Sequence, residues 1–198
     1  NFLEKYHKYV FVDGNECYLT EKHKDISPIV IDLDFRFDGE LKRRYNKDWI
    51  QKFVALYMNE ISKIVKLPTT TDIFVMEKDT PIQDKAVVKD GIHIIIPSIV
   101  TEPKVQFIVR SRMIKTQECI ELMESIECKN DINDIVDLCV IERNNWQFYG
   151  SMKPNNIPYK VTKIFKRNNA TKLFANVGVD TFTNKDFLKL FSIRNKTE

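Results

Sequence analysis

The sequence lacks the long apolar stretches that would attach it to a membrane. Its 198 residues contain no apolar run near the roughly 20 residues that a membrane-spanning helix needs. The first residues do not have the pattern of a secretory signal peptide either, so we expect no membrane partner. Methionine is missing from the first position, and we expect the chain to be a fragment of a longer protein.

Cysteine and glycine are too sparse to form the common metal and nucleotide motifs. The four cysteines form no CxxC pair and no cluster with histidine at zinc-site spacing, which favours reduced thiols in an intracellular protein. Neither GxGxxG nor GxxxxGK[ST] occurs among the five glycines, which argues against a dinucleotide site or a Walker ATPase in this segment.

Acidic residues are scarce in the last quarter of the chain. Residues 143–198 hold 11 Lys and Arg but 3 Asp and Glu, a net charge of +8, whereas residues 1–142 hold 20 basic and 25 acidic residues, a net charge of −5. This asymmetry suggests an anionic partner for the basic part, and a solvated basic surface is the alternative. Lys163, Lys166 and Arg167 are the candidate contacts to a nucleic-acid backbone.

The spacing of apolar residues predicts a mixed α+β chain, in an order that is not that of a Rossmann or P-loop domain. Strands are expected at residues 29–35, 72–77, 92–96, 145–151 and 159–165, and a hairpin over 8–21 around Asp13-Gly14. Helices are expected at residues 46–67, 103–127 and 184–191, and a short helix or turn at 131–137.

Individual residues set the boundaries of these elements. Asn46 and Asn184 are expected to cap the helices that follow them. Pro97 is expected to end the strand before it, because proline cannot donate a hydrogen bond within a sheet. The polar stretch 78–91 is expected to be a mobile loop with a turn at its end.

Two aspartates follow an apolar run in SPIVIDLDFRFDGE, residues 27–40. Residues two apart on a strand share a face, so Asp32 and Asp34 should point one way while Ile31, Leu33 and Phe35 point the other. Two neighbouring carboxylates repel each other, which favours a hard divalent cation between them. Solvated acids at the end of a strand are the alternative.

A site for two metal ions usually needs a third carboxylate, and Asp137 is the candidate. It ends a second apolar run, after Ile135 and Val136. An acid in a turn or a helix cap explains the same position equally well.

Two further segments carry residue types that bind phosphate. In KDGIHIIIP, strand alternation places Lys89, Gly91 and His93 on one face, although a half-buried histidine without a ligand is the alternative. Lysine supplies a point charge, and glycine allows close approach of the backbone. In YGSMKP, Ser151 and Lys153 could hold a phosphate or form a plain turn.

These motifs occur in an order that resembles the archaeo-eukaryotic primase superfamily. VIDLDF, GIHIII and VDLCVIERNNWQFYGSMKP are similar to its first, second and third motifs. The segments DLDFRF, PYKVT and FSIRNK resemble the primase domain of primase-helicases from large nucleocytoplasmic DNA viruses of the poxvirus and asfarvirus type. The resemblance extends from about Ile29 to Arg194.

The resemblance implies the archaeo-eukaryotic primase fold, in which two interlocked α/β lobes, one with a sheet like an RNA-recognition motif, enclose a catalytic cleft. It implies that Mg²⁺ or Mn²⁺ binds to Asp32, Asp34 and Asp137. It also implies that the nucleotide phosphates are bound by Lys89, His93, Ser151 and Lys153. The chain departs from its relatives at Gly91, where many have serine, and at Gln147, near which cellular relatives carry arginine.

We therefore expect residues 1–198 to be a primase catalytic domain, followed in the same protein by a helicase region. The expected activity is DNA-templated nucleotide transfer from NTP or dNTP on a single-stranded DNA template, making primers for viral replication in the host cell cytoplasm. A metal-dependent nuclease would use the same acids without needing Lys89, His93 or Lys153. A non-catalytic nucleic-acid-binding module of a replication helicase would tolerate loss of the acids.

Overall fold

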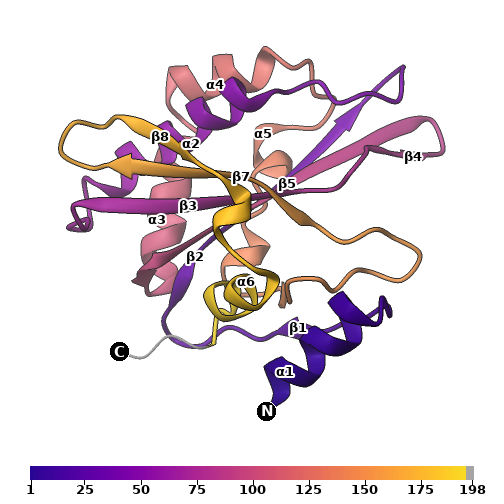
Figure 1. Ribbon diagram of the computed structural model, residues 1–198. Coiled ribbons are helices and arrows are strands. Elements are labelled where there is room, and N and C mark those ends of the chain that lie inside the picture. Colours follow the sequence, from indigo (N-terminus) through magenta and orange to yellow (C-terminus); the bar gives the residue numbers. More distant parts are fainter. Residues whose placement is uncertain (195–198) are drawn as a thin grey trace.

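A computed structural model describes residues 1–194, and its centre is a six-stranded antiparallel sheet (Figure 1). The strands lie in the order β2 (Ser27–Phe37), β5 (Val87–Thr101), β3 (Thr70–Glu77), β7 (Lys160–Asn168) and β8 (Phe174–Val177), with β4 (Ile82–Asp84) paired to β5. A separate two-stranded sheet joins β1 (Thr20–Glu21) to β6 (Trp146–Gln147). The mixed α+β prediction is confirmed.

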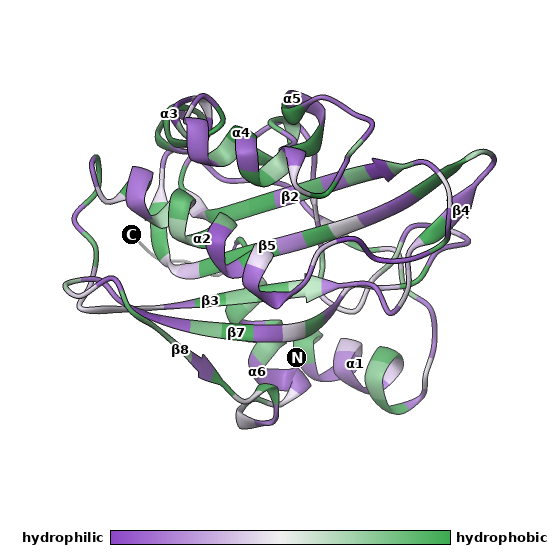
Figure 2. Ribbon diagram, turned by 90° about the horizontal axis from the view of Figure 1, so that it is seen from above, coloured by the Kyte–Doolittle hydropathy of each residue, from purple (hydrophilic) through white to green (hydrophobic). Residues whose placement is uncertain are grey.

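Helices cover both faces of the large sheet. Seen from above in Figure 2, one face carries α2 (Lys47–Ile61), α3 (Pro103–Met113), α4 (Gln117–Glu124) and α5 (Ile132–Ile135). The other face carries α1 (Phe2–His7) and α6 (Asn184–Phe191). Each face has its own hydrophobic cluster. The expected division into two interlocked lobes is not confirmed, because both clusters pack on the same sheet.

Short helical turns complete the described chain. A π-helical turn (Lys8–Val12) continues α1, and two 3₁₀ turns occur at Cys139–Ile141 and Val179–Thr181. Among residues 1–194, none of the helices combines the length and apolar character that crossing a bilayer requires. Asn195 and Lys196, the last two residues of FSIRNK, lie outside the described residues.

The alternation along β2 is confirmed. Ile31, Leu33 and Phe35 are buried in the cluster beneath α2, while Val30 belongs to the cluster on the opposite face. Asp32 and Asp34 share the face of Val30, because residues two apart on a strand point the same way. One strand therefore contributes to a core on one side and presents carboxylates on the other.

The prediction of the helix after residue 46 is confirmed at its start. The Asn46 side chain accepts a hydrogen bond from the Trp49 backbone N–H at 2.9 Å. The helix ends earlier than predicted, at Ile61. The cap of the last helix was assigned one residue too late: Thr183 caps α6, and Asp186 completes a reciprocal capping box with it.

The hairpin predicted over residues 8–21 is wrong. Residues 2–12 are helical, and Gly14 adopts φ +71°, a conformation common where a helix ends. Tertiary packing explains the difference: the Phe11 ring lies so close to Gly150 that a side chain there would collide with it. This contact orders the aromatic residues as a helical turn rather than as a strand.

The loop predicted over residues 78–91 is wrong beyond residue 81. β4 and β5 form a hairpin there, with its turn at Lys85, which has φ +54°. β5 also continues through Pro97, which lies at a register shift: Ile29 pairs with Ile96, whereas Pro28 pairs with Val100. A proline at such an irregularity does not break the strand, because the ladder does not need its missing N–H.

The single helix predicted over residues 103–127 is two helices in the structure. α3 ends at Met113, and α4 begins after Thr116, whose hydroxyl accepts a hydrogen bond from the Cys119 backbone N–H at 3.3 Å. Threonine favours this capping role over the interior of a helix, because its hydroxyl satisfies an otherwise unpaired N–H. Strand β8 was not predicted.

Arg167, which the sequence suggested as a nucleic-acid contact, lies inside the fold. It is 1% exposed and donates hydrogen bonds to the Asn59 and Asn169 side-chain oxygens at 2.8 and 2.7 Å. The prediction that it binds nucleic acid is wrong, because its guanidinium ties β7 to the end of α2.

We expect Arg167→Ala to lower the free energy of unfolding by about 2–4 kcal/mol, since it leaves a cavity and two unpaired amide oxygens. Chemical denaturation measures this change. The neighbouring Lys166, which is about half exposed, supplies the control: Lys166→Ala should change stability by less than ~0.5 kcal/mol. An Arg167→Ala protein of parental stability would contradict the assignment.

Candidate active site

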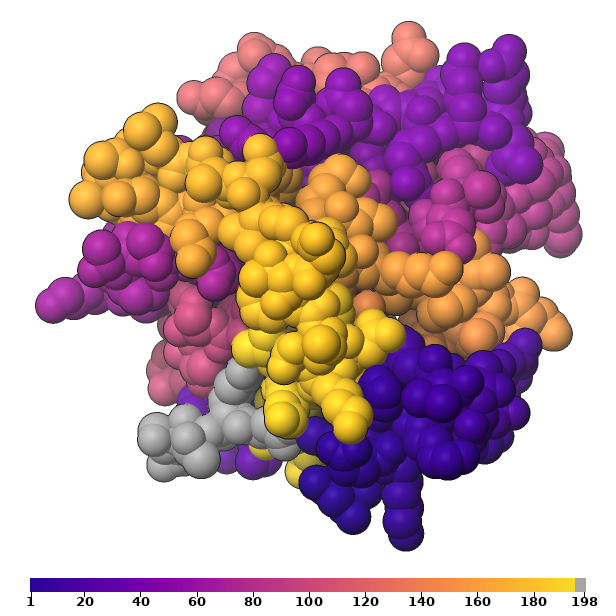
Figure 3. Space-filling view, viewed as in Figure 1, coloured from indigo at the N-terminus to yellow at the C-terminus, as the bar shows by residue number. Residues whose placement is uncertain are grey.

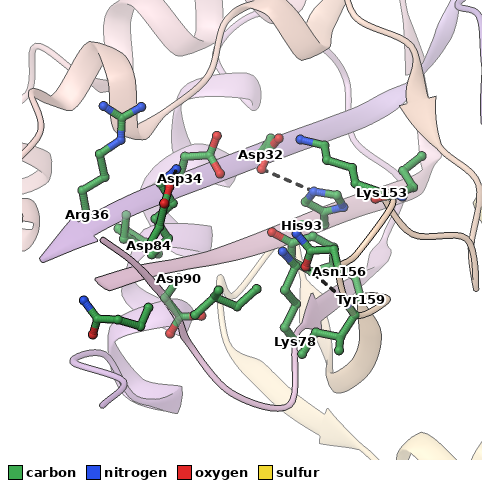
Figure 4. A pocket seen from close by; sticks show the side chains of 16 residues that line it. Asp32, Asp34, Arg36, Lys78, Asp84, Asp90, His93, Lys153, Asn156 and Tyr159 are labelled. Atoms are coloured by element: carbon green, nitrogen blue, oxygen red, sulfur yellow. Dashed lines mark hydrogen bonds and ion pairs between the residues drawn. The ribbon is translucent and has the colours of Figure 1, made fainter. Parts of the chain in front are cut away.

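A pocket of about 460 Å³ opens over the second half of β2 and the first half of β5 (Figure 4). Its walls come from these two strands, from β4 and the segment before it, and from residues 147–159. Both acidic and basic side chains line it, and Figure 4 shows Asp32, His93 and Lys153 close together in it.

Strand pairing brings the first two motifs together. In the antiparallel register of β2 and β5, Asp32 lies opposite His93, and Asp34 lies opposite Gly91. Directly opposite residues point to the same face of a sheet. The Asp32 Oδ1 and His93 Nε2 atoms are 3.4 Å apart.

Asp137 reaches the same region through its backbone. Its N–H donates a hydrogen bond to the Asp32 carbonyl at 3.0 Å, and the preceding Val136 forms a β-bridge with Leu33. Arg110 of α3 holds this segment from the other side, because its guanidinium donates to the carbonyls of Val136 and Asn133 at 2.7 and 2.9 Å.

Burial and neighbouring carboxylates raise the pKa values of Asp32 and Asp34. Burial, followed by the charges of Asp34 and Asp137, raises the pKa of Asp32 well above its usual range. Burial also raises the pKa of Asp34, where the Lys153 charge opposes the shift and the Asp137 charge adds to it. The Asp32 Oδ1 atom is buried and accepts no hydrogen bond. Concentrated negative charge with an unsatisfied oxygen has the chemistry that a hard divalent cation requires.

The side chains are not gathered into a closed coordination shell. Within the described range 1–194, no three His, Cys, Asp or Glu side chains form a group that could hold a metal ion as they stand. The Asp137 carboxylate instead accepts a hydrogen bond from the Cys139 backbone N–H at 2.8 Å. Carboxylate oxygens are donors that suit Mg²⁺ or Mn²⁺. The assignment of Asp32, Asp34 and Asp137 as metal ligands stays a prediction.

His93 is held by aromatic rings. Its imidazole stacks on Tyr159 with the ring centroids 3.6 Å apart, and Trp146 lies at 4.8 Å. Burial, together with the charges of Lys78 and Lys153, lowers the pKa of His93 to about 3. The ring is therefore neutral at physiological pH, and its contact with Asp32 is not an ion pair. His93 can donate a hydrogen bond to a phosphate but does not add positive charge.

Three lysines line the pocket, and one of them was not foreseen. Lys89 pairs with Asp84 across the β4–β5 hairpin, and the Lys153 charge opposes the raised pKa values of the aspartates. The unforeseen residue is Lys78, whose ammonium lies 5.0 Å from the centre of the Tyr159 ring. The sequence carried no signal for it, because it lay in a segment interpreted as a loop.

Tyr159 is a second site residue that the motifs do not predict, although it lies in the PYKVT segment. Its hydroxyl lies against Gly91, where an added Cβ would come within 2.6 Å of it. Gly91, which lacks a side chain, therefore makes room for the Tyr159 hydroxyl. Gln147, the other departure, lines the pocket without an arginine's charge.

Ser151 is not part of the pocket. It is buried, and its hydroxyl lies 2.7 Å from the Tyr6 hydroxyl and accepts a hydrogen bond from the Leu19 N–H. Figure 3 shows the N-terminal helix, in indigo, against the orange segment that contains Ser151. The structure thus gives Ser151 a structural contact to the N-terminal region in place of the expected contact to a nucleotide.

The remaining two basic candidates lie on β7, away from the pocket. Lys163 forms an ion pair with the buried Glu77, and Lys166 lies 3.6 Å from Asp72. Lys163 is 22% exposed and Lys166 is 48% exposed, so Lys166 is the more accessible of the two to a nucleic acid.

The comparisons with known proteins agree with the order of the motifs. A family model described as "C962R protein N-terminal AEP domain" matches residues 1–165. The chain therefore belongs to the archaeo-eukaryotic primase (AEP) class and, within it, to the family of the C962R protein N-terminal domain.

Two viral relatives were found by sequence. The chain is 35% identical over 167 residues to "Putative helicase L207/L206" of Acanthamoeba polyphaga mimivirus, which covers 83% of this chain and 17% of that protein. It is 27% identical over 180 residues to "Putative helicase 184R" of Invertebrate iridescent virus 6, which covers 79% of this chain and 18% of that protein. The chain thus spans less than a fifth of the length of either relative.

The raised pKa of Asp32 predicts an unusual dependence of stability on pH. A carboxyl with a raised folded-state pKa favours folding while it is protonated, and this contribution is lost as the pH rises through the folded pKa. At neutral pH without metal, Asp32→Asn should therefore raise the melting temperature by a few degrees, since one pKa unit corresponds to about 1.4 kcal/mol.

Thermal melts in EDTA at pH 8 and at stepwise lower pH test this expectation. The advantage of Asp32→Asn should shrink as the pH falls and the parent carboxyl takes up a proton. The exposed Asp25, which precedes β2, supplies the control, because Asp25→Asn should melt like the parent at pH 8. A destabilised Asp32→Asn protein at pH 8 would rule out the repulsion.

Proposed function

We propose that this domain is a DNA-template-directed nucleotidyltransferase that makes primers for viral DNA replication. The observation that carries the proposal is the pocket itself: two strand-borne carboxylates share its surface with His93 and with the lysines Lys89 and Lys153. Acids that fit a divalent cation beside cations that fit a triphosphate are the chemistry that phosphoryl transfer needs. The family supports the same reaction class.

The chain's own residues would bind and orient the substrates. Asp32, Asp34 and Asp137 would hold Mg²⁺ or Mn²⁺, which when bound lowers the pKa of an attacking hydroxyl and stabilises the leaving pyrophosphate. Lys153 and Lys89 would bind the phosphates as point charges. His93, fixed by its stack on Tyr159, would donate a hydrogen bond to a phosphate oxygen.

The other partners follow from the relatives and from the charge distribution. Because both viral relatives are named as helicases, we propose a helicase region elsewhere in the same protein and a role at the viral replication site in the host cytoplasm. We also propose that a single-stranded DNA template lies against the basic last part of the chain, with Lys166 and, to a smaller extent, Lys163 contacting its backbone.

One assay separates this function from its two alternatives. The domain is incubated with single-stranded template, NTPs or dNTPs, and Mg²⁺ or Mn²⁺, and the products are resolved by length. Extension supports the nucleotidyltransferase, shortening of the template supports a metal-dependent nuclease, and unchanged DNA with measurable binding supports a non-catalytic module.

We expect Asp34→Ala to abolish synthesis and Lys153→Ala to weaken nucleotide binding roughly ten- to a hundredfold, the value of a charge-assisted contact of ~1.5–3 kcal/mol. His93→Ala should have a smaller effect, since its ring is neutral. Equilibrium binding of nucleotide and of single-stranded DNA measures these changes separately, and DNA binding should change little. Lys104→Ala, at an exposed ion pair on α3, is the control. Normal synthesis by Asp34→Ala would refute the assignment of the acids.

A further inference from the structure

The guanidinium of Arg43 joins the end of β3 to the first part of β5. Regular pairing of β3 with β5 ends at the pair Glu77–Ile92. Beyond it, Arg43 from the segment between β2 and α2 donates to the two Asp90 carboxylate oxygens at 2.9 and 3.2 Å. The same guanidinium lies 3.1 Å from Glu77 Oε1 and donates to the Lys78 carbonyl at 2.8 Å. Arg43 thus replaces the missing ladder contacts between the two strands.

The carboxylates that Arg43 binds are fully enclosed. The Asp90 side chain is 0% exposed and the Glu77 side chain is 1% exposed, whereas that of Arg43 is 26% exposed. The Glu77 carboxylate also contacts Lys163. Removing one partner of such a group leaves an uncompensated buried charge, which is costly, so the arrangement holds these carboxylates in one orientation.

Strand geometry transmits this orientation to the pocket. Successive side chains on a strand point to opposite faces, so Lys89 and Gly91 in β5 point away from the face of Asp90. Lys78 directly follows the last residue of β3, and the Arg43 guanidinium holds its backbone carbonyl. Lys78 and Lys89 both line the pocket, and Gly91 lies opposite Asp34, which also lines it. Arg43 therefore fixes the backbone that carries Lys78 and Lys89, although it forms no hydrogen bond with their side chains.

Lys78 has the surroundings of a residue that awaits an anion. It is half-buried and lies beside Tyr159 in the wall of the pocket (Figure 4). Among residues 1–194, its ammonium forms no salt bridge, whereas Lys89 is paired with Asp84. The charges of Asp32 and Asp34 act on it without a direct ion pair. A half-buried ammonium in this position gains much from a ligand that brings negative charge into direct contact with it.

We infer that Lys78 binds the triphosphate of the incoming nucleotide and that Arg43 is the positioning residue that holds Lys78 toward it. The identity of the anion rests on the proposed function. The positioning of Lys78 by Arg43 rests on the contacts alone.

A double-mutant cycle tests the coupling. The variants are Arg43→Lys, which keeps the charge but loses the forked donor geometry, Lys78→Ala, and the two combined. Binding of ATP and dATP is measured by calorimetry below the melting temperature of every variant. Lys78→Ala should weaken binding about tenfold or more and Arg43→Lys several-fold, and the double variant should bind no more weakly than Lys78→Ala. Arg44→Lys, at a neighbouring arginine outside this arrangement, should bind like the parent.

A second measurement needs no nucleotide. Lysines are ¹³C-dimethylated, and the Lys78 resonance is identified by its absence in Lys78→Ala. The nearby Tyr159 ring should shift this resonance away from those of exposed lysines. Arg43→Lys should move it toward them, and Arg44→Lys should not.

The two measurements separate the possible failures. Independent, additive losses in binding together with an unmoved Lys78 resonance in Arg43→Lys would overturn the positioning role. Parental nucleotide binding by Lys78→Ala would overturn the role of Lys78. A parent protein that binds no nucleotide would refute the proposed function and the identity of the anion, while the Lys78 resonance would still decide whether Arg43 positions that side chain.

Discussion

Antiparallel pairing of β2 with β5 places Asp32 opposite His93 and Asp34 opposite Gly91, and the other parts of the pocket are arranged around these pairs. The pairing is maintained by the cluster beneath α2, into which both strands send alternate side chains. A shift of one residue would turn the acids into that core and the isoleucines toward the pocket, which the cost of burying charge forbids. The hydrophobic face of the sheet thus determines where the polar site lies.

Because this pairing places the acids close together, they repel one another electrostatically. Asp32 and Asp34 have raised pKa values because they are buried near each other and near Asp137, and the Lys78 and Lys153 charges offset the repulsion only in part. Such an arrangement costs stability while no cation is bound, and it fits a site whose charge is completed by a ligand. Arg43 and Arg110 contribute from outside the pocket, where they hold the segments that carry Lys78 and Asp137.

Much of the local structure could be predicted because it depends on neighbours in the sequence. Period-two alternation placed Ile31, Leu33 and Phe35 on one face and both aspartates on the other, and Asn46 marked the start of α2. Motif order was sufficient to recognise the AEP class. The residues predicted for the site that do line the pocket all lie on β2, on β5 or in the segment before β7.

What remained depends on contacts between segments distant in the sequence. Residues 8–12 have a composition typical of a strand, but they form a helical turn in which Phe11 packs on Gly150. This contact between distant segments could not be predicted from the local sequence. Arg167 and Ser151 have residue types that suit binding, but their burial between elements more than 100 residues apart gave them structural roles. Lys78 follows the end of β3 and Tyr159 precedes the start of β7, and these two strands pair with each other there, beside β5. The order of residues along each strand is enough to show which of its faces is apolar and which carries charge. The tertiary structure decided which charged residues meet, because side-chain alternation is a local property and strand pairing is not.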